Sequence, residues 1–404
     1  MQSKISRRTF TKAAAASLAI PAFVPSTSLG LGKRPAPSDR IVMATVGTGG
    51  RGTGDMNSFM RFPEVQMVAV CDPVPPHRER AKGIVDRKYS NTDCQSTSDF
   101  REVVSRDDVD AVLIGTPDHW HAIITIECCK NGKDVFCEKP ESLTIAEGRA
   151  MVTAARKYSR VVSGGSQRVL GDYGDIPRLV RGGAIGKVQE IFVSCGGPSG
   201  ECYLKPEKEI RGMDWSMWLG PAPFRPFNQK LVRGGFRPFR DYSGGGMTDW
   251  GAHRFGAAMF AAGIHKMGPK SITPPNGKDV KHLTFEFENG LKMYHGGTNN
   301  ITYKGTEGTV PGKHPQFMER VDMEGYRGRG GIFGDFIDCV KTRELPFRDI
   351  EIAHRACTVC HLGNIAYWLN RPLKWDPEKE QIIDDEAANR WLDRPRRGDW
   401  KLEV

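Results

Sequence analysis

The sequence "VGTGGRG" places the strongest constraint on the fold. Gly47, Gly49 and Gly52 directly follow the apolar, β-branched run "IVMATVG" and precede a stretch with helical spacing of apolar residues. Asp72 ends the next apolar run, "VQMVAVCD", twenty positions after Gly52. Glycines between a strand and a helix let backbone N–H groups approach a pyrophosphate, and an acid ending the second strand can accept hydrogen bonds from ribose hydroxyls. The pattern therefore predicts a dinucleotide-binding unit.

The same residues bear on which dinucleotide is bound. The carboxylate of Asp72 would repel a 2′-phosphate, which favours NAD, whereas Arg51 keeps NADP open as the less favoured cofactor. Thr116 and Pro117 follow the third apolar strand, so we expect them under the nicotinamide half at the carboxyl edge of the sheet.

The chain around this motif reads as an α/β domain. Between residues 40 and 167, short apolar runs alternate with stretches of helical periodicity. Such alternation is typical of a parallel, doubly wound sheet that helices cover on both faces. We therefore expect a Rossmann domain over 40–167.

The pattern changes in residues 168–404. The segments 185–197 and 280–297 alternate apolar and polar residues, as strands of an antiparallel sheet do. Helices are expected near 331–342 and 350–369, and these could pack back on the Rossmann domain. The prediction is an α+β substrate and oligomerisation domain with a large open, mainly antiparallel sheet, in a protein that we expect to be a homo-oligomer.

Residues 1–39 have the composition of an export signal and a linker. Arg7 and Arg8 stand in "SRRTFTK", followed by the short apolar run 13–20 and then Pro21. The run is too short to span a bilayer, and the order of the three features matches a twin-arginine signal. We expect periplasmic or other export by this route, without stable membrane insertion after processing.

Charge and cysteine content exclude some classes of protein. The net charge is +10, but residues 1–34 hold six basic residues and no acid, which leaves 10 − 6 = +4 for the rest. No basic stripe with interleaved aromatics is present, so we expect no nucleic-acid partner. The ten cysteines do not imply a disulfide framework in a chain of 404 residues.

Lys139 stands in "CEKP", at the end of the next predicted strand and at the same edge of the sheet. Pro140 disfavours the α region for Lys139 and keeps it extended, so its side chain should face the crevice. There the ammonium would stabilise a developing alkoxide. The alternative is a surface ion pair between Lys139 and Glu138.

A second group of polar residues lies in "SGGGMTDWGAHRFGAAMF". Asp249 and His253 are four residues apart in a predicted helix, so they share one face. This pairing suits acid–base chemistry, in which the imidazole takes a proton and the carboxylate sets its tautomer. An N-terminal Asp with an ordinary core histidine is the equal alternative.

"VGTGGRG", "TPDHWHA", "CEKP" and "GGGMTDWGAHR" together resemble the family of glucose–fructose oxidoreductase, inositol dehydrogenase and MocA-like enzymes, from Arg40 onward. The resemblance implies that Lys139, Asp249 and His253 are catalytic and meet at the substrate carbon facing the nicotinamide. It also places His121 and Glu138 beside the cofactor. The expected cofactor-binding residues are Gly47, Gly49, Gly50, Arg51, Gly52, Asp72, Thr116, Pro117, His121, Glu138 and Lys139.

Two sequence patterns could indicate a metal site, but a structural role explains each of them better. We therefore expect no metal site. Cys357, Cys360 and His361 match a haem-attachment pattern, but they lie in "IEIAHRACTVCHLGNIAYWLN", which reads as a buried helix. His119 and His121 are two apart at a helix start, so their side chains diverge.

The expected function is an exported NAD(P)-dependent oxidoreductase acting on CH–OH groups of a carbohydrate, cyclitol or polyol, with a tightly held nicotinamide. The alternative is a redox-neutral enzyme that cleaves or epimerises a glycoside through transient oxidation of the sugar by bound NAD. A non-catalytic binding or electron-transfer protein would require haem at Cys357 and Cys360.

Overall fold

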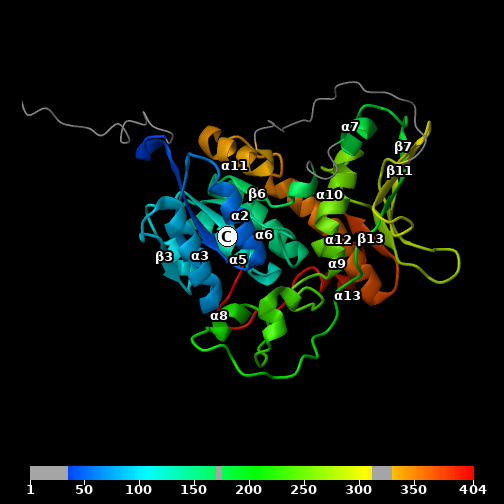
Figure 1. The fold of residues 1–404 in the computed structure, drawn as a ribbon. Helices are drawn as coiled ribbons and strands as arrows, with labels where there is room; N and C mark the ends of the chain where they lie inside the picture. The colour runs from blue at the N-terminus through cyan, green and yellow to red at the C-terminus, as the bar shows by residue number, and fades with distance from the viewer. Residues whose placement is uncertain (1–34, 170–174, 312–329) are drawn as a thin grey trace, which may run out of the picture.

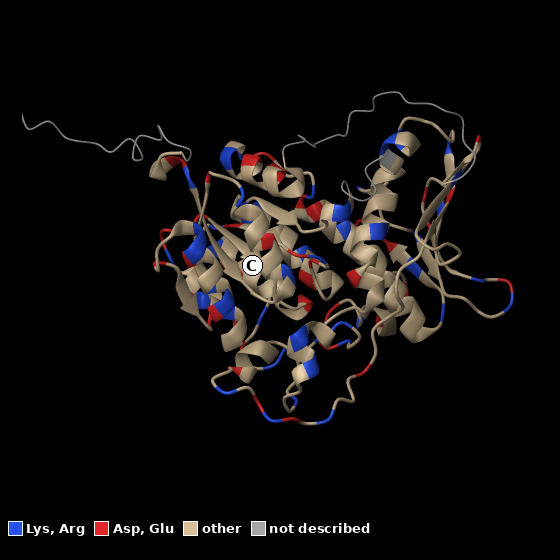
Figure 2. Cartoon of the chain, in the orientation of Figure 1, with Lys and Arg blue, Asp and Glu red and all other residues tan. Residues whose placement is uncertain are grey.

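The computed structural model describes residues 35–169, 175–311 and 330–404. The predicted export signal, including Arg7 and Arg8, lies outside the described residues. No helix within the described ranges combines the length and apolar character needed to cross a membrane. Figure 2 shows Lys and Arg interspersed with Asp and Glu along the chain.

The first domain is a parallel six-stranded sheet with the order β3-β2-β1-β4-β5-β6. β4 and β5 are buried at every position, as strands covered on both faces must be. The strands are β1 Ile41–Val46, β2 Val65–Cys71, β3 Gln95–Thr97, β4 Ala111–Ile114, β5 Asp134–Cys137 and β6 Val162–Gly164. The helical segments are η1 Pro37–Asp39, α2 Gly50–Phe59, α3 Pro75–Tyr89, α4 Phe100–Val104, α5 Asp118–Lys130, α6 Ile145–Lys157 and η2 Gln167–Val169.

The second domain is built on a mixed, mostly antiparallel eight-stranded sheet, ordered β12-β11-β7-β10-β9-β8-β13-β14. Only β7 and β10 pair in parallel among these strands as described. The strands are β7 Val188–Val193, β8 Ser271–Thr273, β9 Leu283–Glu286, β10 Lys292–His295, β11 Ile301–Gly305, β12 Thr309–Val310, β13 Leu373–Asp376 and β14 Gln381–Ile382. The helical segments are α7 Asp175–Arg181, α8 Trp215–Leu219, η3 Leu231–Gly235, α9 Gly246–Asp249, α10 Gly251–Ala261, α11 Gly331–Thr342, α12 Ile350–Leu369 and α13 Glu386–Asn389.

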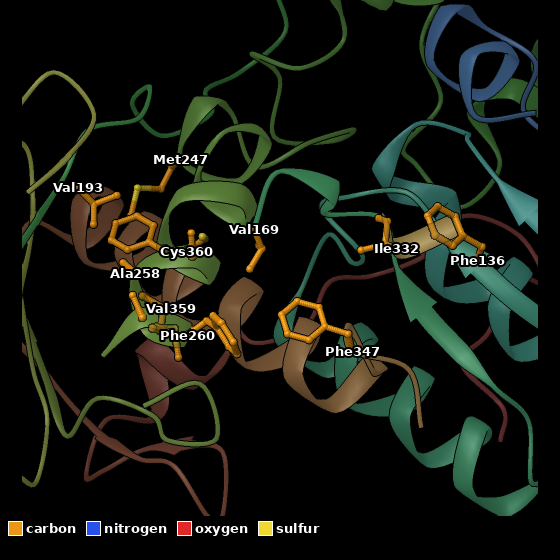
Figure 3. Packing of buried hydrophobic residues seen from close by; sticks show 14 of the residues in the cluster. Phe136, Val169, Val193, Met247, Ala258, Phe260, Ile332, Phe347, Val359 and Cys360 are labelled. Atoms are coloured by element: carbon orange, nitrogen blue, oxygen red, sulfur yellow. The ribbon is translucent and has the colours of Figure 1, made fainter. Parts of the chain in front are cut away.

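The predicted fold class is confirmed, and the two domains share one hydrophobic core. A single buried cluster contains Phe136 of β5, Ile332 of α11 and Phe260 of α10 (Figure 3). The chain also differs from the sequence expectation in places. It continues past α12 into β13, β14 and α13, and the polar edge strand β3 and short helix α4 were not anticipated.

Residues 198–242, which we call the roof segment, form a loop with little regular structure that reaches the first domain (Figure 1). Its own aromatic cluster includes Trp215 and Trp218, whose rings stack at 4.8 Å. Asp214 N donates to Pro73 O at 3.2 Å, so the segment is tied directly to the end of β2. Within this segment the short helix α8 therefore serves as an anchor on the first domain.

Residues 390–404, the C-terminal segment, also run back onto the first domain (Figure 1). Trp400 packs against Trp120 of α5 with ring centroids 4.7 Å apart, and Phe100 of α4 lies at 6.1 Å. Arg397 donates to the backbone oxygens of Ser216 and Gly220. The C-terminal segment thus fastens the roof segment to the first domain.

Candidate functional site

The glycine turn after β1 has the geometry that a close-approaching ligand requires. Gly47 has φ +85°, and a Cβ there would overlap the backbone of Thr116. A Cβ on Gly52 would overlap Gly47 O, so Gly52 is needed for close packing of α2 on the strand. Gly49 and Gly50, in contrast, face open space, since nothing lies within 4 Å of a Cβ at either position. Gly47 and Gly52 therefore shape the turn, whereas Gly49 and Gly50 leave room for a ligand above it.

A cavity of about 400 Å³ opens above this turn, at the carboxyl edge of the six-stranded sheet. We call that edge the floor. The buried Thr116 Oγ1 finds no hydrogen-bond partner in the described part of the chain, which leaves a polar group for a ligand. The predicted residues that line the cavity are Gly47, Gly49, Gly50, Arg51, Asp72, Thr116, Pro117, Glu138 and Lys139.

Asp72 lies at the cavity wall, but its carboxylate is already engaged. Oδ2 accepts from Thr48 N at 2.8 Å, and Oδ1 accepts from Val74 N at 2.9 Å. The Nδ1 atom of His77 lies 3.5 Å from Oδ2. Asp72 therefore holds the turn in place as well as presenting negative charge to the cavity.

Arg51 and Glu138 join the glycine turn to the end of β5. Arg51 Nε lies 3.1 Å from Glu138 Oε1, and Arg51 Nη2 lies 2.6 Å from the buried Asp55. Burial, together with the nearby charge of Glu138, raises the pKa of Asp55 to about 9, so this carboxyl is protonated at pH 7. Glu138 therefore pairs with Arg51 across the floor. It does not form the surface ion pair with Lys139 that was the alternative from the sequence.

Lys139 instead reaches the second domain. Its Nζ donates to Asp249 Oδ1 at 2.6 Å and to Asp249 O at 2.9 Å. Arg237 of the roof segment donates from Nε to the same Oδ1 at 3.1 Å. Burial opposes ionisation, but Lys139 and Arg237 outweigh it and hold the pKa of Asp249 below its ordinary value. The carboxylate of Asp249 is thus the point where the floor, the roof segment and the second domain meet.

His253 lies close to this group but has a different partner. The helix is interrupted at Trp250, between α9 and α10. His253 Nδ1 lies 2.8 Å from Ser166 Oγ. Among the hydrogen bonds of the described residues, none joins His253 to Asp249. Ser166, not Asp249, therefore sets the tautomer of the imidazole. Burial, with the charge of Lys139 next in effect, lowers the pKa of His253 to about 2, so the ring is neutral at pH 7.

Four of the predicted residues do not line the cavity. Gly52 lies beneath the turn, Asp249 adjoins the cavity through its bond to Lys139, and His253 is close enough to feel the charge of Lys139. His121 is buried, with Nδ1 2.8 Å from Pro140 O and Nε2 2.9 Å from Thr116 O. Because both ring nitrogens are engaged by carbonyls of the floor, His121 supports the cavity wall from behind.

The patterns weighed as metal sites form none in the structure. No cluster of three or more His, Cys, Asp or Glu that could hold a metal occurs in the described ranges. Cys357 and Cys360 are buried within α12, as the sequence predicted. His361 Nε2 donates to Ser142 O at 3.1 Å, a structural contact.

The roof segment supplies the apolar part of the cavity lining. Met217, Trp218, Leu231, Val232 and Phe236 form the apolar side of the cavity. The clustered Trp, Phe and Pro residues of the segment were the available signal, but their position over the first domain depends on contacts between distant parts of the chain.

The chain belongs to the oxidoreductase family named for glucose–fructose oxidoreductase, inositol dehydrogenase and MocA. Residues 41–166 match the model of its NAD-binding Rossmann fold, and residues 197–402 match the model of its C-terminal alpha/beta domain. The glycine turn and the polar floor described above are the parts of this chain that fit a nicotinamide dinucleotide.

Similar proteins include both glycosidases and oxidoreductases by name. An alpha-N-acetylgalactosaminidase of Shewanella oneidensis is 32% identical over 129 residues, 31% of this chain and 28% of that protein. The chain spans between 27% and 38% of the first three curated relatives it matches, which are glycosyl hydrolase family 109 proteins.

Solved structures extend the likeness to most of the chain. Aldose-aldose oxidoreductase from Caulobacter crescentus has a TM-score of 0.58 at 18% identity, covering 83% of this chain and 99% of that one. The WlbA dehydrogenase from Bordetella pertussis, solved with NADH and UDP-GlcNAcA, has a TM-score of 0.59 at 14% identity with the same coverage. At these identities the likeness concerns the fold.

Proposed function

We propose that this protein is an exported oxidoreductase that holds NAD tightly and transfers hydride to and from a carbinol carbon of a carbohydrate, cyclitol or polyol. The observation that carries the proposal is the meeting of Lys139, Asp249 and Arg237 at the cofactor cavity, with neutral His253 nearby. When bound, the nicotinamide would supply the hydride acceptor and donor.

The residues of the chain would divide the remaining work. Lys139 stabilises the substrate oxygen as that oxygen gains negative charge. A single well-placed group of this kind can raise the rate roughly a hundredfold or more. Asp249 orients the Lys139 ammonium and can accept a hydrogen bond from a neighbouring hydroxyl of the substrate. His253, which is neutral at pH 7, is the group assigned to take the hydroxyl proton, and its contact with Ser166 fixes which ring nitrogen is available.

Enclosure of the cavity supports tight retention of the cofactor. The roof segment covers one side of the cavity, and the C-terminal segment fastens that cover through Arg397 and Trp400. A retained cofactor in an exported enzyme would have to be regenerated within each cycle, by a second substrate or by the product itself.

The test is to purify the protein from the periplasm without added nucleotide, denature it and assay the released material. We expect stoichiometric nicotinamide dinucleotide. An empty protein that needs continual external NAD, or one confined to the cytoplasm with its leader uncut, would contradict the proposal.

The choice of NAD over NADP rests on Asp72. Asp72→Ala removes the negative charge that a 2′-phosphate would meet, so the preference should shift toward NADP in a titration of the emptied protein. Because Thr48 N and Val74 N would lose their acceptor, the melting temperature should be measured in parallel. Tighter binding of NADP than NAD by the wild type would exclude this role.

A second candidate function is glycoside cleavage through transient oxidation, favoured by the names of the family 109 relatives. In that reaction the sugar is oxidised, loses a proton from the adjacent carbon, eliminates the aglycone, adds water and is reduced again. Aryl glycosides in heavy water would distinguish the two functions. Cleavage would release the aryl group and place deuterium next to the oxidised carbon with no net change in cofactor, whereas simple dehydrogenation would accumulate reduced cofactor.

A further inference from the structure

A second cavity, of about 330 Å³, lies between α12, the region around α13 and residues 240–244. Leu143 and Thr144, which follow the floor in the chain, form another part of its wall. None of its lining residues lines the cofactor cavity. It is therefore a separate space, and the proposed hydride transfer makes no use of it.

One wall of this cavity is aromatic and held in place. The rings of Trp368 and Trp391 lie 5.2 Å apart, centroid to centroid. The guanidinium of Arg240 lies over both rings, at 5.4 and 5.1 Å. Trp368 Nε1 donates to Ser199 O at 2.9 Å, which fixes the plane of that indole. Both indoles are half-buried, so the wall is formed before a ligand arrives.

Two polar groups on the lining have hydrogen-bonding capacity to spare. In the described ranges no donor reaches the carboxylate of Asp241, whose backbone oxygen accepts from Arg394. His361 donates from Nε2 to Ser142 O, so its Nδ1 is an acceptor for which the described residues offer no partner. Hydroxyl groups of a ligand could donate to both.

Most other charges around the cavity are paired, and Arg390, which is also on the lining, lies 3.7 Å from the exposed Glu386. Arg394 Nε lies 2.9 Å from the buried Glu147, and Asp393 lies 2.5 Å from Arg396. An anionic ligand would meet the negative charge of Asp241, and a cationic ligand would meet the positive charge of Arg240. A purely apolar ligand would bury the carboxylate of Asp241 without a partner, which is unfavourable because the group would lose its contact with water.

We propose that this second cavity binds one unit of a neutral saccharide. A sugar ring offers an apolar C–H face for the aromatic wall and hydroxyl donors for Asp241 and His361, which is the combination the lining requires. Arg240 Nη2 lies 3.5 Å from Glu201, at an exposed edge where a longer chain could continue. This goes beyond the proposed function, because the site takes no part in hydride transfer.

The test is isothermal titration of the cofactor-loaded protein with methyl glycosides of neutral hexoses and N-acetylhexosamines, and with a methyl glucuronide for comparison. Trp391→Ala and Asp241→Asn should each weaken binding of the neutral glycosides about tenfold. Asp279→Asn, the same charge change on an exposed loop, should leave it unchanged. Binding should persist in Lys139→Met, which separates this site from the hydride-transfer site.

Equal binding by the wild type, Trp391→Ala and Asp241→Asn would overturn the proposal, as would binding that disappears only in Lys139→Met. Trp391→Phe keeps an aromatic face and should retain most of the affinity, so it covers the case in which Trp391→Ala does not fold. Crystals soaked in a methyl glycoside give a test without any variant. Sugar density against Trp391 is expected, and a cavity without sugar at saturating concentration would refute the assignment.

Discussion

The floor and the roof of the cofactor cavity are specified by different kinds of sequence information. The floor comes from the ends of β1, β4 and β5, where each functional residue directly follows a short apolar strand. The roof segment has little regular structure, and Arg397 and Trp400 hold it from far along the chain. The floor is therefore a property of local patterns, whereas the roof depends on the completed fold.

The largest effect should come from Lys139, where the floor meets the second domain. Lys139→Met removes the ammonium that binds Asp249, so turnover on the true substrate should fall roughly a hundredfold or more. His253→Ala should have a comparable effect by removing the proton acceptor. Steady-state rates should be measured with nucleotide content, which both variants should keep. Lys304→Met, on the second sheet, is the matched control, and near-wild-type rates in either test variant would refute the mechanism.

Two glycines of the floor should separate folding from cofactor binding. Gly52→Ala would drive a Cβ into Gly47 O, so we expect a loss of stability of about 1–3 kcal/mol or more, read as a lower melting temperature. Gly49→Ala meets no atom within 4 Å and should fold normally, yet its methyl group would occupy space that a pyrophosphate needs. The expected pattern is an unstable Gly52 variant and a stable Gly49 variant with weakened NAD affinity. Normal NAD affinity in Gly49→Ala would place the pyrophosphate elsewhere.

A smaller effect should come from loosening the roof. Trp400→Ala removes the ring that packs against Trp120, a residue that itself lines the cavity. We expect NAD to dissociate about tenfold faster, as a loss of about 1.4 kcal/mol would produce. Release can be followed by dialysis of the loaded protein against excess unlabelled nucleotide. Lys401→Ala is the exposed neighbouring control, and unchanged release from Trp400→Ala would show that the C-terminal segment does not retain the cofactor.

The last effect concerns the pH dependence of stability and rests on His119, which lies between floor and roof with Nε2 3.0 Å from Trp218 O. Burial, followed by the charge of Arg394, lowers the pKa of His119 to about 3. Between pH 6.5 and 3 the unfolded chain therefore binds a proton that the folded protein excludes. The free energy of unfolding therefore decreases as the pH is lowered through this range. His119→Gln should reduce this fall by about 1.4 kcal/mol per pH unit, with a constant difference above pH 7. Parallel urea unfolding curves at pH 7 and 5 would test it, and identical pH slopes would contradict it.

The sequence was most informative where a local pattern decides the structure. The predicted helices at 331–342 and 350–369 match α11 and α12. β3 was missed because Gln95–Thr97 is a short, polar edge strand with no apolar pattern.

For the site, spacing alone was a weaker guide. The four-residue interval between Asp249 and His253 suggested a direct pair, but the helix breaks at Trp250 and each side chain finds a partner from another element. The contributions of Arg237 and Ser166 depend on tertiary contacts with Asp249 and His253, which no interval in the sequence reveals.

The fastening of the roof by Arg397 and Trp400 also orders events during synthesis. Lys139, the last residue of the floor that lines the cavity, leaves the ribosome long before Trp400 does, so nucleotide could enter while the cavity is still open on one side. Docking of the C-terminal segment would then fasten the roof segment over whatever the cavity contains. Under the proposed twin-arginine route, the cytoplasm is the compartment where loading takes place, and the nucleotide travels across the membrane as cargo of the folded chain.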